Sequence, residues 1–390
     1  MLIKSIYVGF VERMLSSEQA ALRLGVKVPT LYAYVSRGRL ESHRDPSGRG
    51  SLFELADVEA LARRGRGGRQ TETRLVTVTT GVTQLRLDEG PFYRGQSAVT
   101  LSTQASFEQV ASILLEDDSP EPWLAPDLGV CPLTHTADRM RWTLVMCAAA
   151  DPLRADPRRE AVARSARRVM AALTDVVGPG GADEDGATPI ARRLASRLGG
   201  LGGAAEAVNA SLILMADHEL ATSTMAVRVA ASTRADIYDA LLAGLATLSG
   251  PLHGGDSQQA FGLLATAERD GASRALNEFL RQQRRLPGFG HMVYKNGDPR
   301  VVPLLALVEP LLSAERQALL REVMAIALDQ QVPRPNIDLA LAALSWGTGM
   351  PADAGATIFS VARIAGWAAH YLEELSERPL RYRARAVYSR

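Results

Sequence analysis

The 390-residue sequence predicts a mainly α-helical protein in which a small winged helix-turn-helix unit precedes a larger helical body. Three observations support this fold class. Beyond about residue 100, apolar residues recur at i, i+3 and i+4, the pattern of amphipathic helices. The first sixty residues instead fit two short helices joined by a glycine-containing turn and followed by a hairpin. A segment rich in glycine and arginine separates the two regions.

The composition excludes several classes of protein. With 46% hydrophobic and 22% charged residues, the chain is typical of globular proteins, not of disordered or fibrous ones. Its longest apolar run, residues 143–150, is far shorter than the ~18–20 residues of a membrane span. The first twenty residues lack a signal-peptide pattern, and Cys131 and Cys147 form neither a disulfide framework nor a metal motif. We therefore expect a cytoplasmic protein with no membrane partner and no metal.

Residues 1–62 are predicted to form the first domain, which we call the head. Ser16 is expected to cap a first helix, with Gln19 three residues later completing a capping box. Gly25 is expected to end that helix. Pro29 stands near the start of a second helix over residues 30–36.

A turn at 45–48, a strand-like segment at 51–53 and a helix over 57–63 complete the head. This order is the layout of a winged helix-turn-helix, and residues 15–21 and 30–40 resemble the short DNA-binding heads of MerR- and excisionase-like proteins. The resemblance implies a groove-facing surface flanked by Thr30, Tyr32, Tyr34 and Arg37. It also implies phosphate contacts by Arg39, Arg44 and Arg49.

Two interpretations of the head stay open. Residues 1–73 hold 12 basic and 8 acidic side chains, whereas the remainder of the chain holds 32 and 35. A single head with this charge would bind DNA weakly, so dimerisation of the body would have to supply avidity. In the alternative, the head is a protein-contact module whose core holds Leu31 and Val35 and whose arginines are solvated.

Residues 63–73 are predicted to be a linker, because they are rich in glycine and arginine and lack apolar periodicity. The body then occupies residues 74–390. A β-prone patch at 75–80 and a turn-rich segment at 81–96 precede its helices. Helical spacing covers residues 107–115, 140–150, 161–177, 190–198 and 204–248, and we expect the last stretch to break near Glu219.

Three of the six histidines lie in unusual surroundings. Glycines flank His253 and His291, which removes neighbouring side chains and lets a ligand approach the backbone. His218 lies between two acids in a helical stretch. Asp338 begins an apolar helix, where a carboxylate is either a functional group or an N-cap. Arg363 lies in an apolar run, where an unpaired guanidinium would be costly. Together these residues favour a functional site over isolated capping or core roles.

These residues also carry a specific resemblance to citrate synthases. The matching segments, in order, are residues 90–95, 105–111, His218, 250–255, 287–291 with Arg300, 335–338, Arg363 and 383–388. The resemblance therefore covers the chain from about residue 74 to residue 388. It implies a large helical domain with a small subdomain, roughly residues 255–350, inserted in it, and the activity of an acyl-CoA condensing enzyme.

The resemblance also implies a role for each matching residue. Asp338 would remove a methyl proton from acetyl-CoA, His253 would stabilise the resulting enolate, and His291 would protonate the ketone oxygen of oxaloacetate. Oxaloacetate would be held by His218, Arg300, Arg363 and Arg383. CoA would contact Lys295, Gly288 and Asn336. No cofactor beyond the acetyl-CoA substrate is implied, and the enzyme would be a homodimer with Arg383 reaching across the interface.

Several departures from the family leave the substrate open. Met215 stands where many relatives have a second histidine, Asp256 replaces a small residue after two glycines, and Ala384 follows Arg383 in place of proline. A 2-methylcitrate synthase would use propionyl-CoA, whose extra methylene changes binding by only ~1–3 kcal/mol. A third interpretation is a DNA-binding regulator that senses CoA or oxaloacetate through the body.

Overall fold

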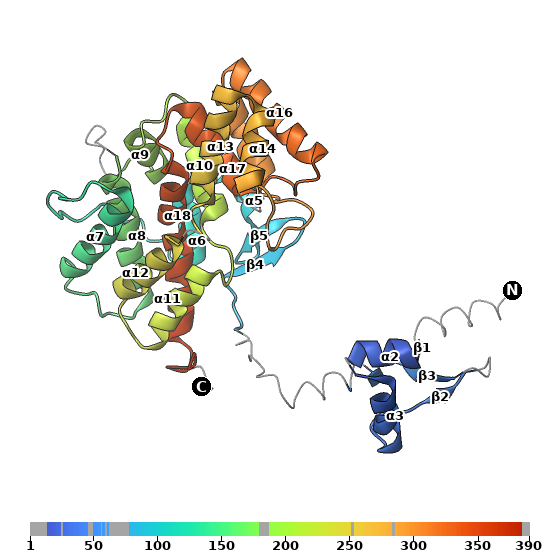
Figure 1. Ribbon diagram of the computed structural model, residues 1–390. Helices are drawn as coiled ribbons and strands as arrows, with labels where there is room; N and C mark the ends of the chain where they lie inside the picture. Colours follow the sequence, from blue (N-terminus) through green and yellow to red (C-terminus); the bar gives the residue numbers. More distant parts are fainter. Residues whose placement is uncertain are drawn as a thin grey trace. The chain divides into compact units, whose positions relative to one another are not determined.

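The computed structural model describes residues 14–24, 26–45, 50–55, 57–58, 61, 78–178, 187–250, 253–282 and 285–383. The chain divides into two compact units, residues 1–78 and 79–390 (Figure 1). The first unit contains the head and the second contains the helical body. The predicted linker at 63–73 lies outside the described residues.

The head has the predicted winged helix-turn-helix order with one additional strand. Its elements are β1 (Met14–Ser16), α2 (Ser17–Leu24), α3 (Val28–Ser36), β2 (His43–Arg44) and β3 (Ser51–Glu54), and the antiparallel sheet has the order β1-β3-β2. The capping box is confirmed, because the Ser16 amide donates to Gln19 Oε1 at 2.9 Å and the Gln19 amide donates to Ser16 Oγ at 3.3 Å. The head also has its own small core, formed by Ala20, Ala21, Leu31, Leu40, Phe53, Val58 and Leu61.

The body begins with a three-stranded sheet that the sequence did not predict. Strands β4 (Thr83–Arg86), β5 (Gly90–Tyr93) and β6 (Gln96–Ser97) pair antiparallel in that order. Of the predicted β-patch at 75–80, the structure describes residues 78–80. The prediction is wrong for these residues, because they have no regular structure. The sheet lies instead in the segment that was expected to contain only turns. Its central strand, β5, is buried along its whole length.

Fourteen α-helices are described in the body. They are α5 (Ala98–Gln104), α6 (Phe107–Leu115), α7 (Thr136–Ala149), α8 (Arg159–Val176), α9 (Ile190–Arg197), α10 (Ala204–Met215), α11 (Thr222–Ser232), α12 (Ile237–Leu248), α13 (Asp256–Asp270), α14 (Ala272–Gln282), α15 (Val301–Val308), α16 (Ala314–Asp329), α17 (Ile337–Thr348) and α18 (Ala354–Leu375). The predicted break near Glu219 is confirmed, and Glu219 itself has φ +53°. A second break separates α11 from α12, where Asp236 caps α12 by accepting from the Asp239 amide at 3.1 Å.

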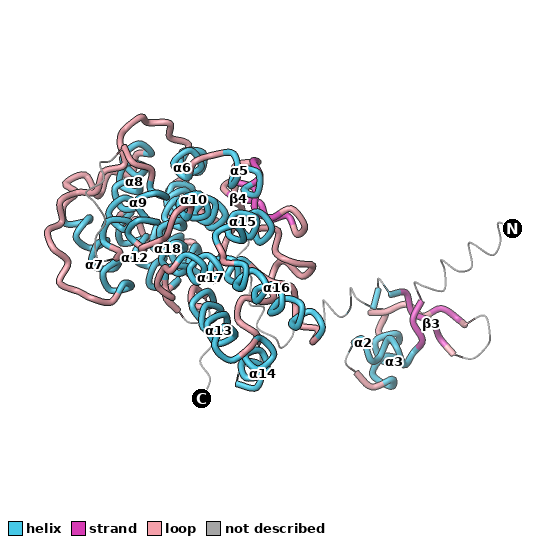
Figure 2. The backbone as a smooth tube through the Cα atoms, turned by 90° about the horizontal axis from the view of Figure 1, so that it is seen from above, coloured by secondary structure: helices cyan, strands magenta, loops and turns pink. Residues whose placement is uncertain are grey.

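Helix α18 lies at the centre of the body, where it packs against α6, α8, α10, α11 and α12 (Figures 1 and 2). Residues 357–371 of this helix are all buried, and they include Arg363 and His370. Helices α13, α14, α16 and α17 pack mainly against one another at one side of the body. No described helix is both long and apolar enough to cross a membrane.

Candidate active site

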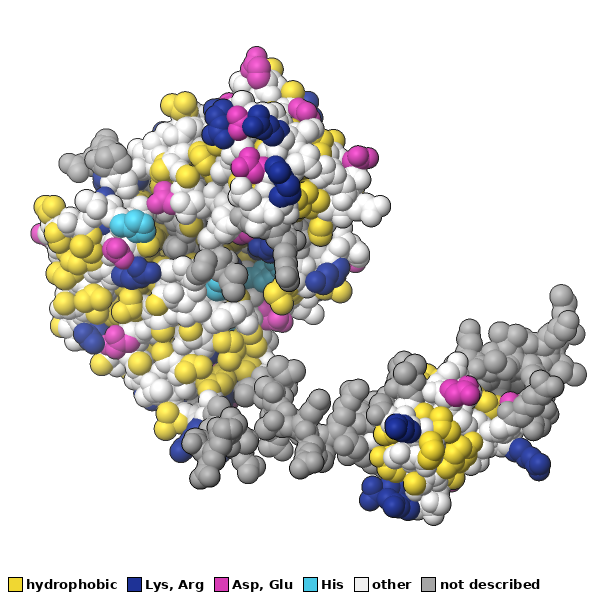
Figure 3. Space-filling model, in the orientation of Figure 1, with side chains coloured by type: hydrophobic (Ala, Val, Ile, Leu, Met, Phe, Trp, Pro, Cys, Tyr) yellow, Lys and Arg dark blue, Asp and Glu magenta, His cyan; other side chains and the backbone are white. Residues whose placement is uncertain are grey.

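Site residues predicted from five parts of the body lie together. The rings of His218 and His291 meet edge to face with centroids 5.3 Å apart, and Tyr294 stacks on His291 at 4.7 Å. The space-filling view shows histidine side chains near the centre of the body, beside basic side chains (Figure 3). The contributing segments are the turn after α10, the turn before α13, the loop before α15, the start of α17 and the middle of α18.

His291 is held as a neutral ring with a defined tautomer. Its Nδ1 accepts from the backbone amides of Val293 at 3.0 Å and Tyr294 at 3.2 Å. Burial, reinforced by the charge of Arg300, lowers the pKa of His291 to about 4. The single ring proton of the neutral form therefore lies on Nε2, which makes this atom a hydrogen-bond donor.

His253 is also held in a defined tautomer, but its accepting nitrogen is Nε2 and not Nδ1. Its Nε2 accepts from the Ser223 amide at 3.3 Å and lies 2.9 Å from Ser223 Oγ. The proton of the neutral ring is thus placed on Nδ1. Burial lowers the pKa of His253, and the charge of Arg363 lowers it further. His253 lies in a turn three residues before α13 begins.

His218 contacts the loop that carries His291 and Tyr294. Its Nε2 lies 3.1 Å from the Tyr294 hydroxyl. Burial lowers the pKa of His218 well below its ordinary value, and the charges of Arg300 and Arg363 act in the same direction. At neutral pH, three uncharged histidine rings therefore lie near two arginines.

Arg300 is a buried cation whose charge is matched within the chain. Its Nε and Nη2 donate to the two carboxylate oxygens of Asp298 at 2.9 and 2.8 Å. The Asp298 side chain is itself buried and also accepts from the Ile337 amide at 3.0 Å. Asp298 thereby ties Arg300 to the first residue of α17, beside Asp338. The remaining nitrogen, Nη1, lies 3.6 Å from the Met215 sulfur.

Arg363, in contrast, forms no ion pair among the described residues, although the charge of the buried Asp217 carboxylate favours its charged form. Its side chain is 1% exposed, its Nε donates to the Met215 carbonyl at 2.8 Å, and its Nη1 has no hydrogen-bond partner among the described residues. Burial lowers the pKa of Arg363 to about 10. A buried guanidinium with an unused donor is suited to receive an acceptor group from a ligand, because burial without a partner is strongly unfavourable.

Asp338 lies at the second position of α17 and does not cap it. The N-cap is Asn336, whose Oδ1 accepts from the Asp338 amide at 3.0 Å. The capping interpretation of Asp338 was therefore wrong, because the actual cap precedes it by two residues. Burial raises the pKa of the Asp338 carboxyl to about 7, and the charge of Asp256 adds to this shift. Such a carboxylate is matched to proton abstraction near neutral pH.

Of the three residues predicted to contact CoA, two have structural roles. Asn336 donates from Nδ2 to the Gly290 carbonyl at 2.8 Å and from its amide to the Gly288 carbonyl at 2.9 Å. Gly288 has φ +81°, and a Cβ there would lie 3.0 Å from Leu339 Cβ. Both residues hold the His291 loop against α17. Lys295 is exposed, and its Nζ lies 3.4 Å from the His291 carbonyl.

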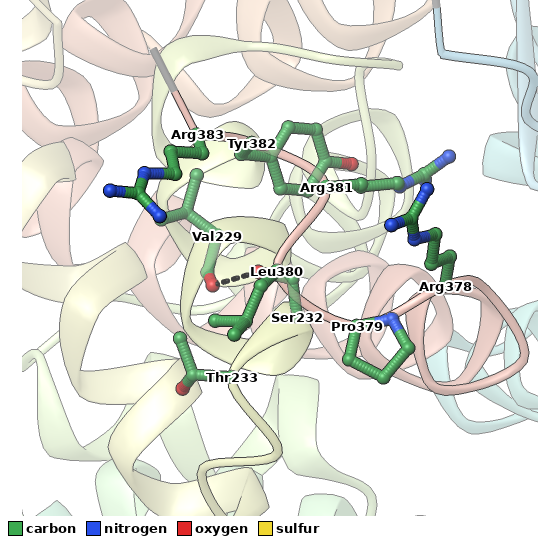
Figure 4. A pocket seen from close by; sticks show the side chains of 9 residues that line it. All are labelled: Val229, Ser232, Thr233, Arg378, Pro379, Leu380, Arg381, Tyr382 and Arg383. Carbon is green, nitrogen blue, oxygen red and sulfur yellow. Dashed lines mark hydrogen bonds between the residues drawn. The ribbon is translucent and has the colours of Figure 1, made fainter.

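Arg383 is not brought to the histidines and arginines within one chain. It is exposed and lines a surface cavity of ≈ 760 Å³ beside the end of α11 (Figure 4). The segment before it is fixed by Glu374, which accepts from Arg381 Nε at 2.7 Å and from the Tyr382 hydroxyl at 2.8 Å. The rest of the predicted tail motif, residues 384–388, lies outside the described residues.

The head presents some but not all of the predicted DNA-contacting side chains. Thr30, Arg37, Arg39 and Arg44 are exposed, whereas Arg49 lies outside the described residues. Tyr34 is half-buried and packs against the apolar core of the head. Tyr32 is 42% exposed, and its hydroxyl lies 2.9 Å from Ser17 Oγ, which attaches α3 to α2.

Sequence reasoning missed four residues that shape the site. Met215 was noted only as a departure, yet it contacts both arginines. Asp298 could have been predicted from the sequence, because it lies two residues before Arg300. Ser223 carried no signal, because its partner His253 lies thirty residues away in the chain. Tyr294 lies three residues after His291, on which it stacks, but its contact with His218 is distant in the chain. Among the described residues, no group of three or more His, Cys, Asp or Glu side chains could hold a metal ion.

Comparison with known proteins gives relatives for both units. The family "Citrate synthase, C-terminal domain" matches residues 129–385, and the family "Helix-turn-helix domain" matches residues 14–66. Citrate synthase 2 of Bacillus subtilis is 35% identical over 190 residues, which are 47% of this chain and 50% of that protein. The 2-methylcitrate synthase 2 of Corynebacterium glutamicum is 32% identical over 219 residues, 53% of this chain and 56% of that protein. The chain thus spans about half the length of these curated relatives.

Solved structures confirm the fold. Citrate synthase from Thermotoga maritima superposes with a TM-score of 0.66 and 22% identity, covering 82% of this chain and 96% of that one. The enzyme from Thermoplasma acidophilum, solved as a ternary complex with carboxymethyl coenzyme A and oxaloacetate, also gives 0.66 and 22%, with 81% and 94% covered. By the match over residues 129–385, this chain belongs to the citrate synthase family.

Proposed function

We propose that the body condenses an acyl-CoA thioester with oxaloacetate, as a citrate synthase does. The observation that carries the proposal is the complementary setting of the two glycine-flanked histidines. In each ring one nitrogen accepts from a backbone amide, which places the ring proton on the other nitrogen. The site thus holds two neutral donors of fixed tautomer, a carboxyl group with a raised pKa and two buried arginines. Enolate chemistry on a dianionic acceptor requires these groups.

In the first step, the Asp338 carboxylate removes a proton from the methyl carbon of the acyl-CoA. The thioester methyl is a very weak acid, so the enolate needs a donor at its oxygen. Nδ1–H of His253 is that donor. Since His253 is neutral, its proton is shared with the enolate oxygen and not fully transferred before the carbon reacts.

In the second step, the enolate carbon attacks the ketone carbon of oxaloacetate, and a carbon–carbon bond forms. Nε2–H of His291 polarises the ketone oxygen and then protonates it. The proton that Asp338 took is released to solvent, which reprotonates His291, so both residues regain their starting states. Arg363 offers its unused Nη1 to one carboxylate of oxaloacetate, while Arg300 and His218 contribute from the adjoining loops. Water then hydrolyses the thioester and releases free CoA together with the citrate product.

A thiol-release assay tests the proposal. We expect purified protein to liberate CoA from acetyl-CoA only when oxaloacetate is present. If acetyl-, propionyl- and butyryl-CoA all give no oxaloacetate-dependent thiol, the enzyme interpretation is wrong. The body would then be better explained as a sensor of CoA or oxaloacetate for the head.

Propionyl-CoA is the second candidate substrate, and its product would be 2-methylcitrate. A citrate synthase and a 2-methylcitrate synthase match this chain at similar identity, 35% and 32% respectively. A single methylene changes binding by only ~1–3 kcal/mol, so the ratio of the two kcat/KM values is the appropriate measurement. A ratio within about tenfold would identify a dual-specificity enzyme.

We also propose that the body works as a homodimer. Apolar side chains gather on the surface over α7 and around α11 (Figure 3), and Val145, Val229 and Leu380 are 53%, 45% and 66% exposed. A second copy covering this face would bury them and would bring the tail with Arg383 close to a neighbouring site. Sedimentation equilibrium tests the dimer, and a monomer at micromolar concentration would contradict it.

For the head we propose binding to duplex DNA. Support comes from the helix-turn-helix family match and from the exposed Arg37, Arg39 and Arg44. The protein would then combine an enzymatic body with a DNA-binding head. Retention of genomic fragments by the full-length chain at low salt, and their release as salt rises, is the expected result.

A further inference from the structure

Asp256 is an acidic side chain close to the candidate site. It is the first residue of α13, three residues after His253. Its carboxylate receives Arg285 Nη2 at 2.6 Å through one oxygen and the Gly288 amide at 3.1 Å through the other. The Asp256 side chain is 13% exposed, whereas that of Arg285 is 62% exposed. An acid that is nearly buried is therefore paired with a cation at the surface.

A short chain of hydrogen bonds connects Asp256 to the start of α17. Gly288 donates to Asp256, and the Gly288 carbonyl accepts from the Asn336 amide at 2.9 Å. Asn336 in turn caps the helix through the Asp338 amide. Gly288 also lies between the two helices, because a Cβ there would be 3.1 Å from Ala260 Cβ of α13 and 3.0 Å from Leu339 Cβ of α17. Asp256 and Asp338 thus occupy the first turns of two packed helices.

Four charged groups act on the Asp338 carboxyl from the elements around it. Asp256 and Asp298 raise its pKa, whereas Arg300 and Arg285 lower it. Asp298 and Arg300 form a bidentate pair in the interior, so their charges largely offset each other. The other pair is less well balanced, because solvent screens the exposed guanidinium of Arg285 more than the nearly buried carboxylate of Asp256.

We propose that Asp256 and Arg285 are positioning residues that set the basicity of Asp338, with Asp256 making it a stronger base and Arg285 moderating the effect. The proposal rests on the proposed function, in which Asp338 takes the methyl proton. A stronger base removes a proton from a weak carbon acid faster, but a smaller share of it is ionised at a given pH. The charge pair adjusts this balance without either residue touching the substrate.

Two substitutions separate this role from a purely structural one. Asp256→Asn keeps an oxygen for the Gly288 amide and removes the charge, so the acidic limb of the kcat–pH profile moves to lower pH by roughly half to one unit. The kcat plateau falls by about two- to threefold because the base is weaker. Arg285→Gln leaves Asp256 unpaired and moves the same limb to higher pH. A structural defect would reduce kcat in both variants without opposite shifts of the limb.

Matched controls come from residues of the same charge elsewhere on α13 and on α14. Asp270→Asn removes an acid at the other end of α13, and Arg281→Gln removes an exposed arginine of α14. Neither control shifts the limb. Saturating acyl-CoA is used throughout, so any contact of Arg285 with CoA appears in KM and not in the kcat profile. Circular dichroism and melting temperature verify that each variant is folded.

A second measurement does not need activity. The ionisation of Asp338 is followed by carbon-13 NMR of labelled aspartate carboxyls and assigned with Asp338→Asn. The expected result is a midpoint that falls in Asp256→Asn and rises in Arg285→Gln. Shifts in one direction, or none, overturn the proposal. Opposite NMR shifts in a protein that releases no thiol uphold the charge pair and reject only the proposed function.

Discussion

Arg300 and Arg363 of the body and Arg37 and Arg39 of the head carry the same charge in opposite environments. Arg300 and Arg363 are almost wholly buried, and Nη1 of Arg363 has no hydrogen-bond partner among the described residues. Arg37 and Arg39 of the head are exposed. Water satisfies an exposed guanidinium, so its position alone says little about a ligand. A buried donor needs a partner, so the unused Nη1 of Arg363 indicates an acceptor group of a ligand at this position. Structure therefore defines the ligand chemistry of the body more sharply than that of the head.

The largest expected effect concerns the base of the body. Asp338→Asn should lower kcat by at least ~10³-fold while oxaloacetate binding persists, because the amide keeps the shape but cannot accept the proton. Single-turnover thiol release and oxaloacetate titration measure the two quantities. Asp329→Asn, an exposed acid at the end of α16, serves as the control and should change neither. A variant with near-normal turnover would remove Asp338 from the mechanism.

The next effect contrasts a buried arginine with an exposed one. Arg363→Gln should raise KM for oxaloacetate by about 100-fold, because it removes charge-assisted hydrogen bonds to a carboxylate. Arg37→Gln in the head should leave that KM unchanged. Steady-state kinetics at saturating acyl-CoA gives both values. An equal response of the two variants would contradict the contrast between the regions.

The head gives a smaller, salt-dependent effect. Substituting both Arg37 and Arg39 by glutamine should weaken DNA binding by roughly tenfold at low salt, because two phosphate contacts are lost. The slope of log affinity against log salt should also become shallower by about one per contact. Fluorescence anisotropy of labelled duplexes measures this for the full-length protein. Equal slopes for wild type and variant would favour the protein-contact module.

Asp338 should also affect stability. The substitution that lowers activity should raise the free energy of unfolding at high pH. Its pKa is about 7 in the folded protein, above the usual 3.8, so the folded state binds the proton more tightly than the unfolded state does. Ionisation therefore destabilises the fold progressively as pH rises from about 4 to 7. Asp338→Asn should be more stable than wild type by about 1–2 kcal/mol at pH 8 and equal to it near pH 4. Urea unfolding at the two pH values provides the test.

The smallest expected effect is that of removing the head. A chain that begins at Gly68 should fold, dimerise and retain its activity, because every candidate catalytic residue lies beyond this point. Thiol release per active site, compared with the full-length protein, measures the outcome. A loss of activity on truncation would show that the head supports the active site, and the two regions would then not be independent.

The sequence predicted helices well where apolar spacing continued through a whole element. Residues 107–115 were predicted and observed with the same bounds, and the Ser16–Gln19 capping box formed as expected. Strand β1 and the sheet β4-β5-β6 were missed. These strands are only two to four residues long, which is too short to show an alternation of apolar and polar residues. They also depend on partners elsewhere in the chain.

The sequence by itself determined the residue types of the site, their order and the helices that carry them, because helix formation depends on neighbours three and four positions away. Only the tertiary structure decided their chemical states. Ser223 fixes the tautomer of His253 from thirty residues away, and Asp256 acts on Asp338 from another helix. Protonation depends on burial and on charges that are close in space. Neither quantity exists until distant segments have packed together.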